Sequence, residues 1–487
     1  MSTGPSVFES FLSTPEMSAV FSPASVMQAM LDFEAALARA QAAEGLVPAA
    51  AAQAIAGVCK AELYDLGALI DASGRAGSLA IPLVKALTQA VGLFDADAAG
   101  FVHWGSTSQD VIDTGLALTA RRALALVDRD LGTLTASLLL LARQHRGVPV
   151  LARTLMQPAQ VVSVDFKLVA WIAPLLRCRQ RLRAAGLQAL QLQLGGAVGT
   201  LSVMGERGPA VAHRVADDLG LRLPPGSWHT QRDELASLAC ELGVLAGALG
   251  KIAKDISLMA QGELGELAEP SGAGRGGSST MPHKRNPVAA MTALAGALRT
   301  PHRVAALLAA MVQEHERGLG NWQAELAETA GLYLGVHGAL KALADAAPGL
   351  QVDAARMRHN IDAQHGLVFA EAVAMQLALQ LGKARAHALL EAWSHEAVAG
   401  GRSLREVLLQ ALAQDDTLRA QLSAGQVEAL FDVDRAAGHA SRVADPQLAL
   451  WQERAAALDA EAPWSAWLPQ QSLVEPFERA RDAEATG

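Results

Sequence analysis

Apolar side chains recur at alternating steps of three and four along two long stretches of the chain. One series runs through Leu235, Leu238, Leu242, Leu245, Leu249, Ile252, Ile256 and Met259, and another through Leu124, Val127, Leu131, Leu134, Leu138 and Leu141. Heptad spacing of this kind places the apolar residues on one side of a helix and is typical of long helices that pack at a shallow angle. Two such helices do not fit on the surface of a small domain, so the pattern predicts an elongated helical bundle.

The rest of the pattern is also mostly helical. Helical periodicity covers about 159 to 186, 287 to 315 and 322 to 346, and kinks are expected at Pro174 and Pro301. Period-two alternation is scarce, and short extended pieces are expected only near Leu192 to Met204. The sequence therefore predicts an all-α fold.

Changes in this pattern divide the chain into units. We expect an N-terminal helical unit, a central unit of long helices, a C-terminal helical unit and a C-terminal extension, over residues 1–114, 115–365, 366–450 and 451–487. The extension carries Trp451, Trp464 and Trp467, whose large aromatic side chains predict that part of it docks onto another surface.

Composition narrows the function classes. A formal charge of -9 with 4% aromatic residues argues against a nucleic-acid surface, which would need a basic face. Uninterrupted apolar runs such as Leu138 to Ala142 are too short to span a bilayer, and the N-terminus shows no export or transit signal, so a cytoplasmic protein is expected. The three cysteines are widely separated, and neither metal-ligand spacing nor a cofactor fingerprint occurs, so neither a metal nor a cofactor is predicted.

Residues 277 to 287 read GSSTMPHKRNP and directly follow a glycine-rich run that starts at Gly272. A loop rich in glycine can bring backbone N–H groups close to an anion, and Lys284 adds a positive charge. A phosphate-binding P-loop is excluded because that pattern needs Gly-Lys-Ser/Thr, whereas Lys284 follows His283. The alternative is a solvated surface loop, but the hydroxyls, lysine and asparagine are too concentrated for a linker. We expect this loop to close over an anionic substrate.

This segment resembles GSSxMPxKxNP, the signature of the fumarase/aspartase superfamily. Five further segments resemble the branch of bacterial 3-carboxy-cis,cis-muconate cycloisomerases: STPEM (13–17), LDFEAALAR (31–39), AIPLVK (80–85), HWGSTSQDVIDT (103–114) and QEHERGLGNWQAE (313–325). The resemblance runs from about residue 8 to about residue 450. It implies a three-domain fold, a homotetramer with a twenty-helix core, active sites composed from three subunits, and a tricarboxylate substrate from protocatechuate (β-ketoadipate) catabolism.

The resemblance also implies roles for individual residues. Ser278 would transfer a proton at the carbon next to a carboxylate, and Lys284 and Asn286 would hold that carboxylate. A serine hydroxyl is a poor base, so neighbouring N–H donors and cations must stabilise its ionised form. The alternative for Ser278 is a loop hydroxyl bonded to backbone.

Thr107 and Ser108 match carboxylate-binding positions in the superfamily, although plain capping of the following helix is also open. His103 matches a histidine of the adenylosuccinate lyase branch and could equally be structural. Basic residues for the carboxylates lie in family-like segments and are left unassigned among Arg153, Arg232, Arg285 and Arg317.

The segment ARTLMQPA (152–159) departs from adenylosuccinate lyases, which have a histidine where this chain has Leu155. An amine leaving group needs a proton from such a histidine, whereas a carboxylate does not, because its conjugate acid has a pKa of about 4. Leu155 therefore favours lactone formation by carboxylate addition, with Thr154 and Gln157 as substrate contacts. The competing hypotheses are a C–N lyase of the superfamily and a non-catalytic structural homologue.

Overall fold

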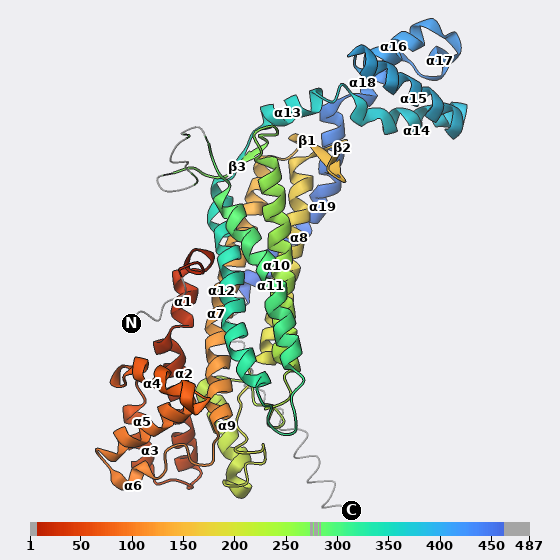
Figure 1. Ribbon diagram of the computed structural model, residues 1–487. Helices are drawn as coiled ribbons and strands as arrows, with labels where there is room; N and C mark the ends of the chain where they lie inside the picture. The colour runs from red at the N-terminus through yellow and green to blue at the C-terminus, as the bar shows by residue number, and fades with distance from the viewer. Residues whose placement is uncertain (1–6, 273–275, 277–280, 282–283, 462–487) are drawn as a thin grey trace, which may run out of the picture.

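The computed structural model describes residues 7–272, 276, 281 and 284–461. Figure 1 shows an elongated bundle with a group of short helices at one end and a second group projecting from the other. The short helices of the first group precede the bundle in sequence, and those of the second group follow it. The predicted all-helical fold is confirmed.

The first group comprises α1 (Pro15–Val20), α2 (Pro23–Ala43), α3 (Ala49–Val58), α4 (Leu66–Ala76), α5 (Ala80–Gly92) and α6 (Ala96–Ala99), with the short turns η1 (Ser10–Leu12) and η2 (Ala61–Leu63). Helix α9 (Gly208–Leu219), preceded by η3 (Gly205–Arg207), packs against α2 at this end. The bundle comprises α7 (Ser108–Gln144), α8 (Val164–Ala189), α10 (Asp233–Met259), α11 (Val288–Ala310) and α12 (Asn321–Ala346).

At the opposite end lie the hairpin β1 (Pro149–Thr154) and β2 (Gln157–Ser163), the short pair β3 (Leu267–Ala268) and β4 (Gln351–Val352), η4 (Ala347–Gly349) and α13 (Ala354–Asp362). The projecting group comprises η5 (Leu367–Phe369), α14 (Ala370–Leu381), α15 (Lys383–Gly400), α16 (Leu404–Gln414), α17 (Asp416–Gln421) and α18 (Ala424–Leu430). Helix α19 (Val433–Ala460) then returns along the bundle against α8 and α7.

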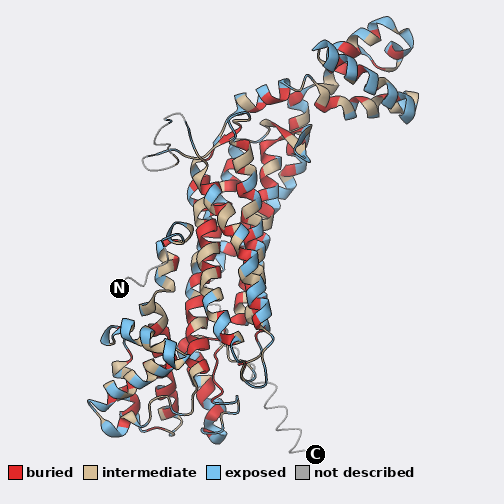
Figure 2. Ribbon diagram, in the orientation of Figure 1, coloured by how far each residue is buried: buried red, intermediate tan, exposed pale blue. Residues whose placement is uncertain are grey.

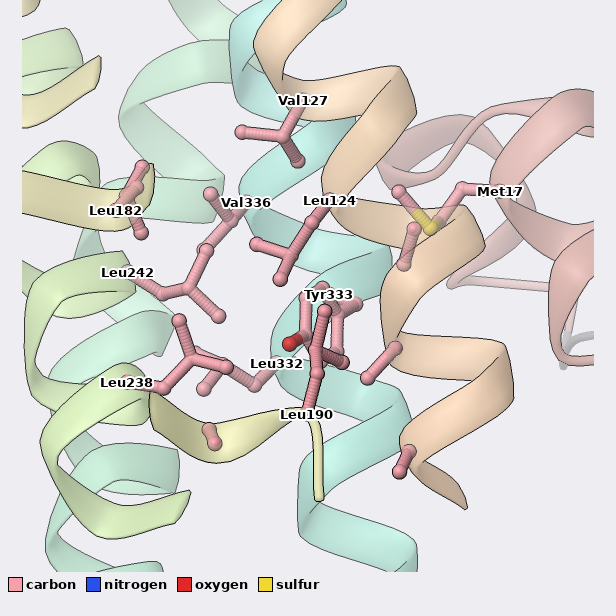
Figure 3. Packing of buried hydrophobic residues seen from close by; sticks show 14 of the residues in the cluster. Met17, Leu124, Val127, Leu182, Leu190, Leu238, Leu242, Leu332, Tyr333 and Val336 are labelled. Atoms are coloured by element: carbon pink, nitrogen blue, oxygen red, sulfur yellow. The ribbon is translucent and has the colours of Figure 1, made fainter. Parts of the chain in front are cut away.

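The two heptad series form the core of the bundle. Every member is buried except Leu235, which is partly buried against the same cluster. In Figure 3, Leu124 of α7, Leu242 of α10 and Val336 of α12 point toward one another, and Figure 2 shows buried residues along the inner faces of the helices. The projecting group has a separate core that includes Val373, Leu408 and Val427.

Helix α10 is long and apolar enough to span a membrane by length and composition alone, although the sequence contains no long unbroken apolar run. In the structure this helix packs against α8, α11 and α12. Its apolar side supplies the buried heptad series described above, so packing within the bundle accounts for its composition.

The prediction of extended structure near Leu192 to Met204 was wrong. Residues 192–204 form no strand; an isolated bridge between Gln191 and Arg222 lies just before them, and the hairpin lies instead at 149–163. The predicted helix from about residue 159 therefore begins later, at Val164, where the Ser163 side chain accepts the backbone N–H of Phe166. Alternation is hard to detect here because Pro158 and a register shift after Ala152 interrupt the short strands.

Candidate active site

A polar turn precedes α7 and contains two of the predicted carboxylate-binding residues. Arg317, from the loop between α11 and α12, donates hydrogen bonds to Oγ1 of Thr107 at 2.7 Å, to Oγ of Ser108 at 3.2 Å and to Oε1 of Gln109 at 3.2 Å. The turn thus combines hydroxyls, a guanidinium group and the N-terminus of a 37-residue helix. These are groups that suit an anion.

A buried carboxylate holds this turn in place. Asp110 is fully buried and accepts the backbone N–H groups of Thr107 at 3.1 Å, Gly195 at 3.1 Å and Gly196 at 2.9 Å. Its Oδ1 also lies 2.8 Å from Nε2 of buried His229. A Cβ on Gly196 would lie 2.9 Å from the carbonyl oxygen of Gly105, so a glycine is needed for this close approach. Asp110 lies within the family-like segment 103–114 but was given no role from the sequence, and His229 had no sequence signal.

A second buried network lies one helical turn further along α7. The guanidinium of Arg232 donates to both oxygens of Asp113, at 2.7 and 3.1 Å, and to Glu325. Trp322 Nε1 donates to Asp113 at 3.0 Å. Burial lowers the pKa of the Arg232 guanidinium, but the charges and hydrogen bonds of Asp113 and Glu325 have a larger effect, so the net shift is upward. The pKa of the Glu325 carboxyl is also raised, because burial disfavours its charged form. Arg232 therefore connects α7, α10 and α12.

His103 lies before this turn and has a carboxylate partner. Its Nδ1 is 2.6 Å from Oε1 of Glu34, a carboxylate on α2 whose side chain is only 1% exposed. Burial lowers the pKa of His103, but the charge and hydrogen bond of Glu34 outweigh it, so the net shift is upward. Glu34 fixes the ring through Nδ1. The only sequence signal for Glu34 was a carboxylate among the apolar residues of the 31–39 segment.

The hairpin carries the third predicted set of residues at its tip. Thr154 pairs with Gln157, which leaves Leu155 and Met156 as a two-residue turn. Both turn residues have positive φ, 51° and 69°, as a type I′ turn requires, although Asn and Gly are the usual choices there. Leu155 is 97% exposed and Met156 68% exposed. Two apolar residues in a costly backbone conformation, exposed in one chain, indicate a tip built to contact something else.

The base of the signature loop lies at the same end of the bundle as the hairpin. Arg153 of β1 donates to Oε2 of Glu266 at 2.9 Å and to Oε1 at 2.6 Å, and Glu266 lies immediately before β3 and is fully buried. Asn360 of α13 also donates to Glu266, at 3.0 Å. Arg153 is therefore committed to this connection between the hairpin and the loop.

Lys284 and Asn286 line a hollow of about 730 Å³ beside the loop. The backbone N–H of Asn286 donates to the carbonyl of Gly276 at 2.9 Å, and Gly276 has a φ of 71°. Lys284 is exposed, and Arg285 donates to the carbonyl of Glu269 at 3.1 Å. Ser278 lies outside the described residues.

One chain does not bring these three sets of residues together. Thr107 and Ser108 stand at the start of α7, whereas the hairpin follows its end. A helix of 37 residues is about 55 Å long at 1.5 Å per residue. The polar turn of one chain therefore lies far from the hairpin and from Lys284 and Asn286 of the same chain. Among the described residues, no group of three or more His, Cys, Asp and Glu side chains could hold a metal ion.

Known protein families, sequences and structures match most of the chain. A family model described as lyase matches residues 11–300, and one described as adenylosuccinate lyase C-terminus matches residues 366–446. The chain is 51% identical over 421 residues to a 3-carboxy-cis,cis-muconate cycloisomerase of Bradyrhizobium diazoefficiens, covering 86% of this chain and 92% of that protein. It is 47% identical over 451 residues to one of Pseudomonas aeruginosa, covering 93% and 96%. The crystal structure of 3-carboxy-cis,cis-muconate lactonizing enzyme from Pseudomonas putida matches with a TM-score of 0.86 and 44% identity, covering 92% of this chain and 100% of that one.

Proposed function

The chain belongs to the lyase family of the fumarase/aspartase superfamily, and we propose that it converts 3-carboxy-cis,cis-muconate to 4-carboxymuconolactone. The similar proteins named above carry this activity in their names. The observation that carries the proposal is the hairpin tip, which presents Leu155 and Met156 and no side chain able to donate a proton. A reaction whose nucleophile and leaving group is a carboxylate needs no such donor.

The chemistry balances with one proton. A terminal carboxylate of the substrate adds to the carbon that bears the third carboxyl group, forming a C–O bond while the C=C π bond breaks. The electron pair moves to the neighbouring carbon, next to the other terminal carboxylate, and that carbon takes a proton from Ser278. The serine regains its proton from solvent, so each turnover converts a trianion to a dianion and consumes one proton.

The remaining residues bind the substrate and stabilise developing charge. Lys284 and Asn286 hold the carboxylate next to the carbanionic carbon, where a positive charge is most effective because negative charge builds up in the transition state. Thr107, Ser108 and Arg317 bind another carboxylate at the start of α7. Placing both the cation and the helix N-terminus there offsets the protein's net charge of -9 locally.

The active site is composite and the protein assembles as a homotetramer. The length of α7 separates the polar turn from the hairpin by about 55 Å, so the two can meet only through different chains. Exposed Leu155 and Met156 gain apolar burial if the hairpin tip of one subunit inserts into the site of another. Thr154 and Gln157, which flank the tip, then reach the substrate.

The activity is tested by following ultraviolet absorbance with 3-carboxy-cis,cis-muconate and, separately, with adenylosuccinate. The proposal predicts loss of the muconate chromophore with uptake of one proton per lactone formed, measured in weak buffer with a pH indicator. Cleavage of adenylosuccinate without muconate activity would favour the C–N lyase, and inactivity toward both substrates would favour a non-catalytic homologue.

The composite site is tested by mixing two inactive variants. Ser278→Ala should lower turnover about a thousandfold or more without a large fall in thermal stability. When Ser278→Ala and Gln157→Ala chains are unfolded together and refolded, hybrid tetramers should recover activity, because some sites receive both intact residues. Verified mixed tetramers without recovery would place each site within one chain.

A further inference from the structure

A hollow of about 670 Å³ lies where the projecting helices meet the hairpin and the start of α19. We call it the C-terminal cleft. Its walls come from β2, α14, α18 and α19, and buried apolar residues such as Val161, Val368 and Phe369 form part of its lining. This volume is in the range of small-molecule sites. None of the residues that line it is among the candidate active-site residues.

One wall of the cleft is a ridge of basic residues. Arg435, His439 and Arg442 lie at positions i, i+4 and i+7 of α19, so they share one face of the helix, and all three line the cleft. None of their side chains makes a hydrogen bond or ion pair with a residue that the structure describes. This sets them apart from the arginines of the bundle, such as Arg179 and Arg183, which are both paired with Asp128.

The acidic residues of the cleft have other partners. Oδ1 of Asp432 accepts the backbone N–H of Arg435 and caps α19, and Glu371 accepts a hydrogen bond from Gln160 of β2. Neither carboxylate is paired with the guanidinium groups of Arg435 or Arg442. The guanidinium groups of Arg435 and Arg442 are therefore a local concentration of unpaired positive charge on a chain whose net charge is -9.

We propose that the C-terminal cleft binds a small di- or tricarboxylate through Arg435 and Arg442, at a site separate from the candidate active site. Arginine presents a planar fork that matches a carboxylate with two parallel hydrogen bonds. Seven residues of helix place the two arginines about 10 Å apart along the axis, and their flexible stems allow both forks to reach one molecule. Gln376 and Gln426 provide amide groups for its remaining oxygens. The apolar lining suits a carbon skeleton better than a bare inorganic anion.

Calorimetric titration with citrate tests this site on the full-length protein. The Lys284→Ala variant serves as the background, because it removes a carboxylate contact of the candidate active site. On this background, citrate should bind, and adding Arg435→Ala with Arg442→Ala should weaken binding tenfold or more. Arg435→Lys with Arg442→Lys should give a smaller loss, since the charge remains and the fork does not.

Arg454→Ala is the matched control, because Arg454 is an exposed arginine further along α19 and should change citrate affinity less than twofold. Turnover of 3-carboxy-cis,cis-muconate by Arg435→Ala/Arg442→Ala should stay within about twofold of the unsubstituted protein. Unchanged citrate affinity in that variant would overturn the proposal. If inorganic phosphate binds as tightly as citrate, the polycarboxylate assignment is overturned. If turnover falls in parallel with citrate affinity, the cleft is part of the active site and the proposal of a separate site is overturned.

Discussion

Replacing Arg317 with alanine tests whether the polar turn before α7 binds a substrate carboxylate. Arg317 is half-buried and donates only to neutral oxygens, those of Thr107, Ser108 and Gln109. Its positive charge has no carboxylate partner in the described part of the chain. Bound substrate would supply one, in place of the weaker neutral contacts.

The expected effect follows from the bonds that are exchanged. A hydrogen bond to a charged group contributes about 1.5–3 kcal/mol, and a guanidinium fork can make two. We take the loss of transition-state binding as about 3 kcal/mol, which allows for partial exposure and for water that replaces the side chain. At about 1.4 kcal/mol per factor of ten, kcat/KM should then fall about a hundredfold. The kcat/KM of Arg317→Lys should fall about tenfold, since lysine keeps the charge but lacks the guanidinium fork. The free energy of unfolding should fall by about 1–3 kcal/mol, because Oε1 of buried Gln109 loses its donor, whereas the hydroxyls of Thr107 and Ser108 can bond to water instead.

The assay is the initial rate of absorbance loss with 3-carboxy-cis,cis-muconate, combined with thermal unfolding of each variant. Arg385→Ala removes the same charge from an exposed position on α15 and should leave kcat/KM within about twofold. A kcat/KM for Arg317→Ala within threefold of the unsubstituted protein would refute the carboxylate role. An equal fall in both alanine variants would instead indicate long-range attraction of the substrate by net positive charge.

Three further predictions concern the surroundings of the site. The raised pKa of His103 beside Glu34 means that their interaction stabilises the fold fully below about pH 6.5, and that this contribution is lost as pH rises through the folded-state pKa. His103→Asn, which tolerates the positive φ of 60° at this position, should therefore cost more unfolding free energy at pH 6 than at pH 9; urea titrations that give equal costs would contradict this. Arg232→Met should lower the free energy of unfolding by about 3–5 kcal/mol, because two buried carboxylates lose their cation, and a loss below about 1 kcal/mol would show that they become protonated at little cost. Leu155→Asn with Met156→Gly should keep the hairpin, since these residues suit its turn, but lower kcat/KM at least tenfold; unchanged kinetics would mean that the tip does not line the site.

The long helices could be predicted because a heptad series needs no knowledge of the partner helix. Leu238 to Met259 repeat along one chain segment, and the repeat itself indicates a buried side. The hairpin offered no comparable signal, because its strands are short and Pro158 interrupts one of them. Pattern length therefore separates the elements that were predicted from the one that was missed.

The candidate site also contains residues that could be predicted from the sequence and residues that could not. The residues of the signature loop and the polar turn were selected because each set lies within one short motif that resembles the superfamily. Their partners do not: Arg317 is 210 residues from Thr107, and Asp110 is 85 residues from Gly195. Arg232 illustrates the consequence, because it had been a possible substrate ligand by charge, whereas the structure buries it between Asp113 and Glu325. The proposed role of Ser278 stays a prediction.

In the proposed composite site, the buried networks at the start of α7 would hold one chain's share of the site in shape. A carboxylate-binding turn that is to meet a hairpin from another subunit must keep its shape before assembly, because its partners arrive only with the other chain. Asp110 fixes the turn through three backbone N–H groups and His229, and Asp113 fixes the helix to α10 and α12 through Arg232. Such preorganisation lowers the conformational entropy lost when the site forms. In the proposed tetramer, rigid ends on a long helix would let residues about 55 Å apart in one chain serve different sites of one assembly.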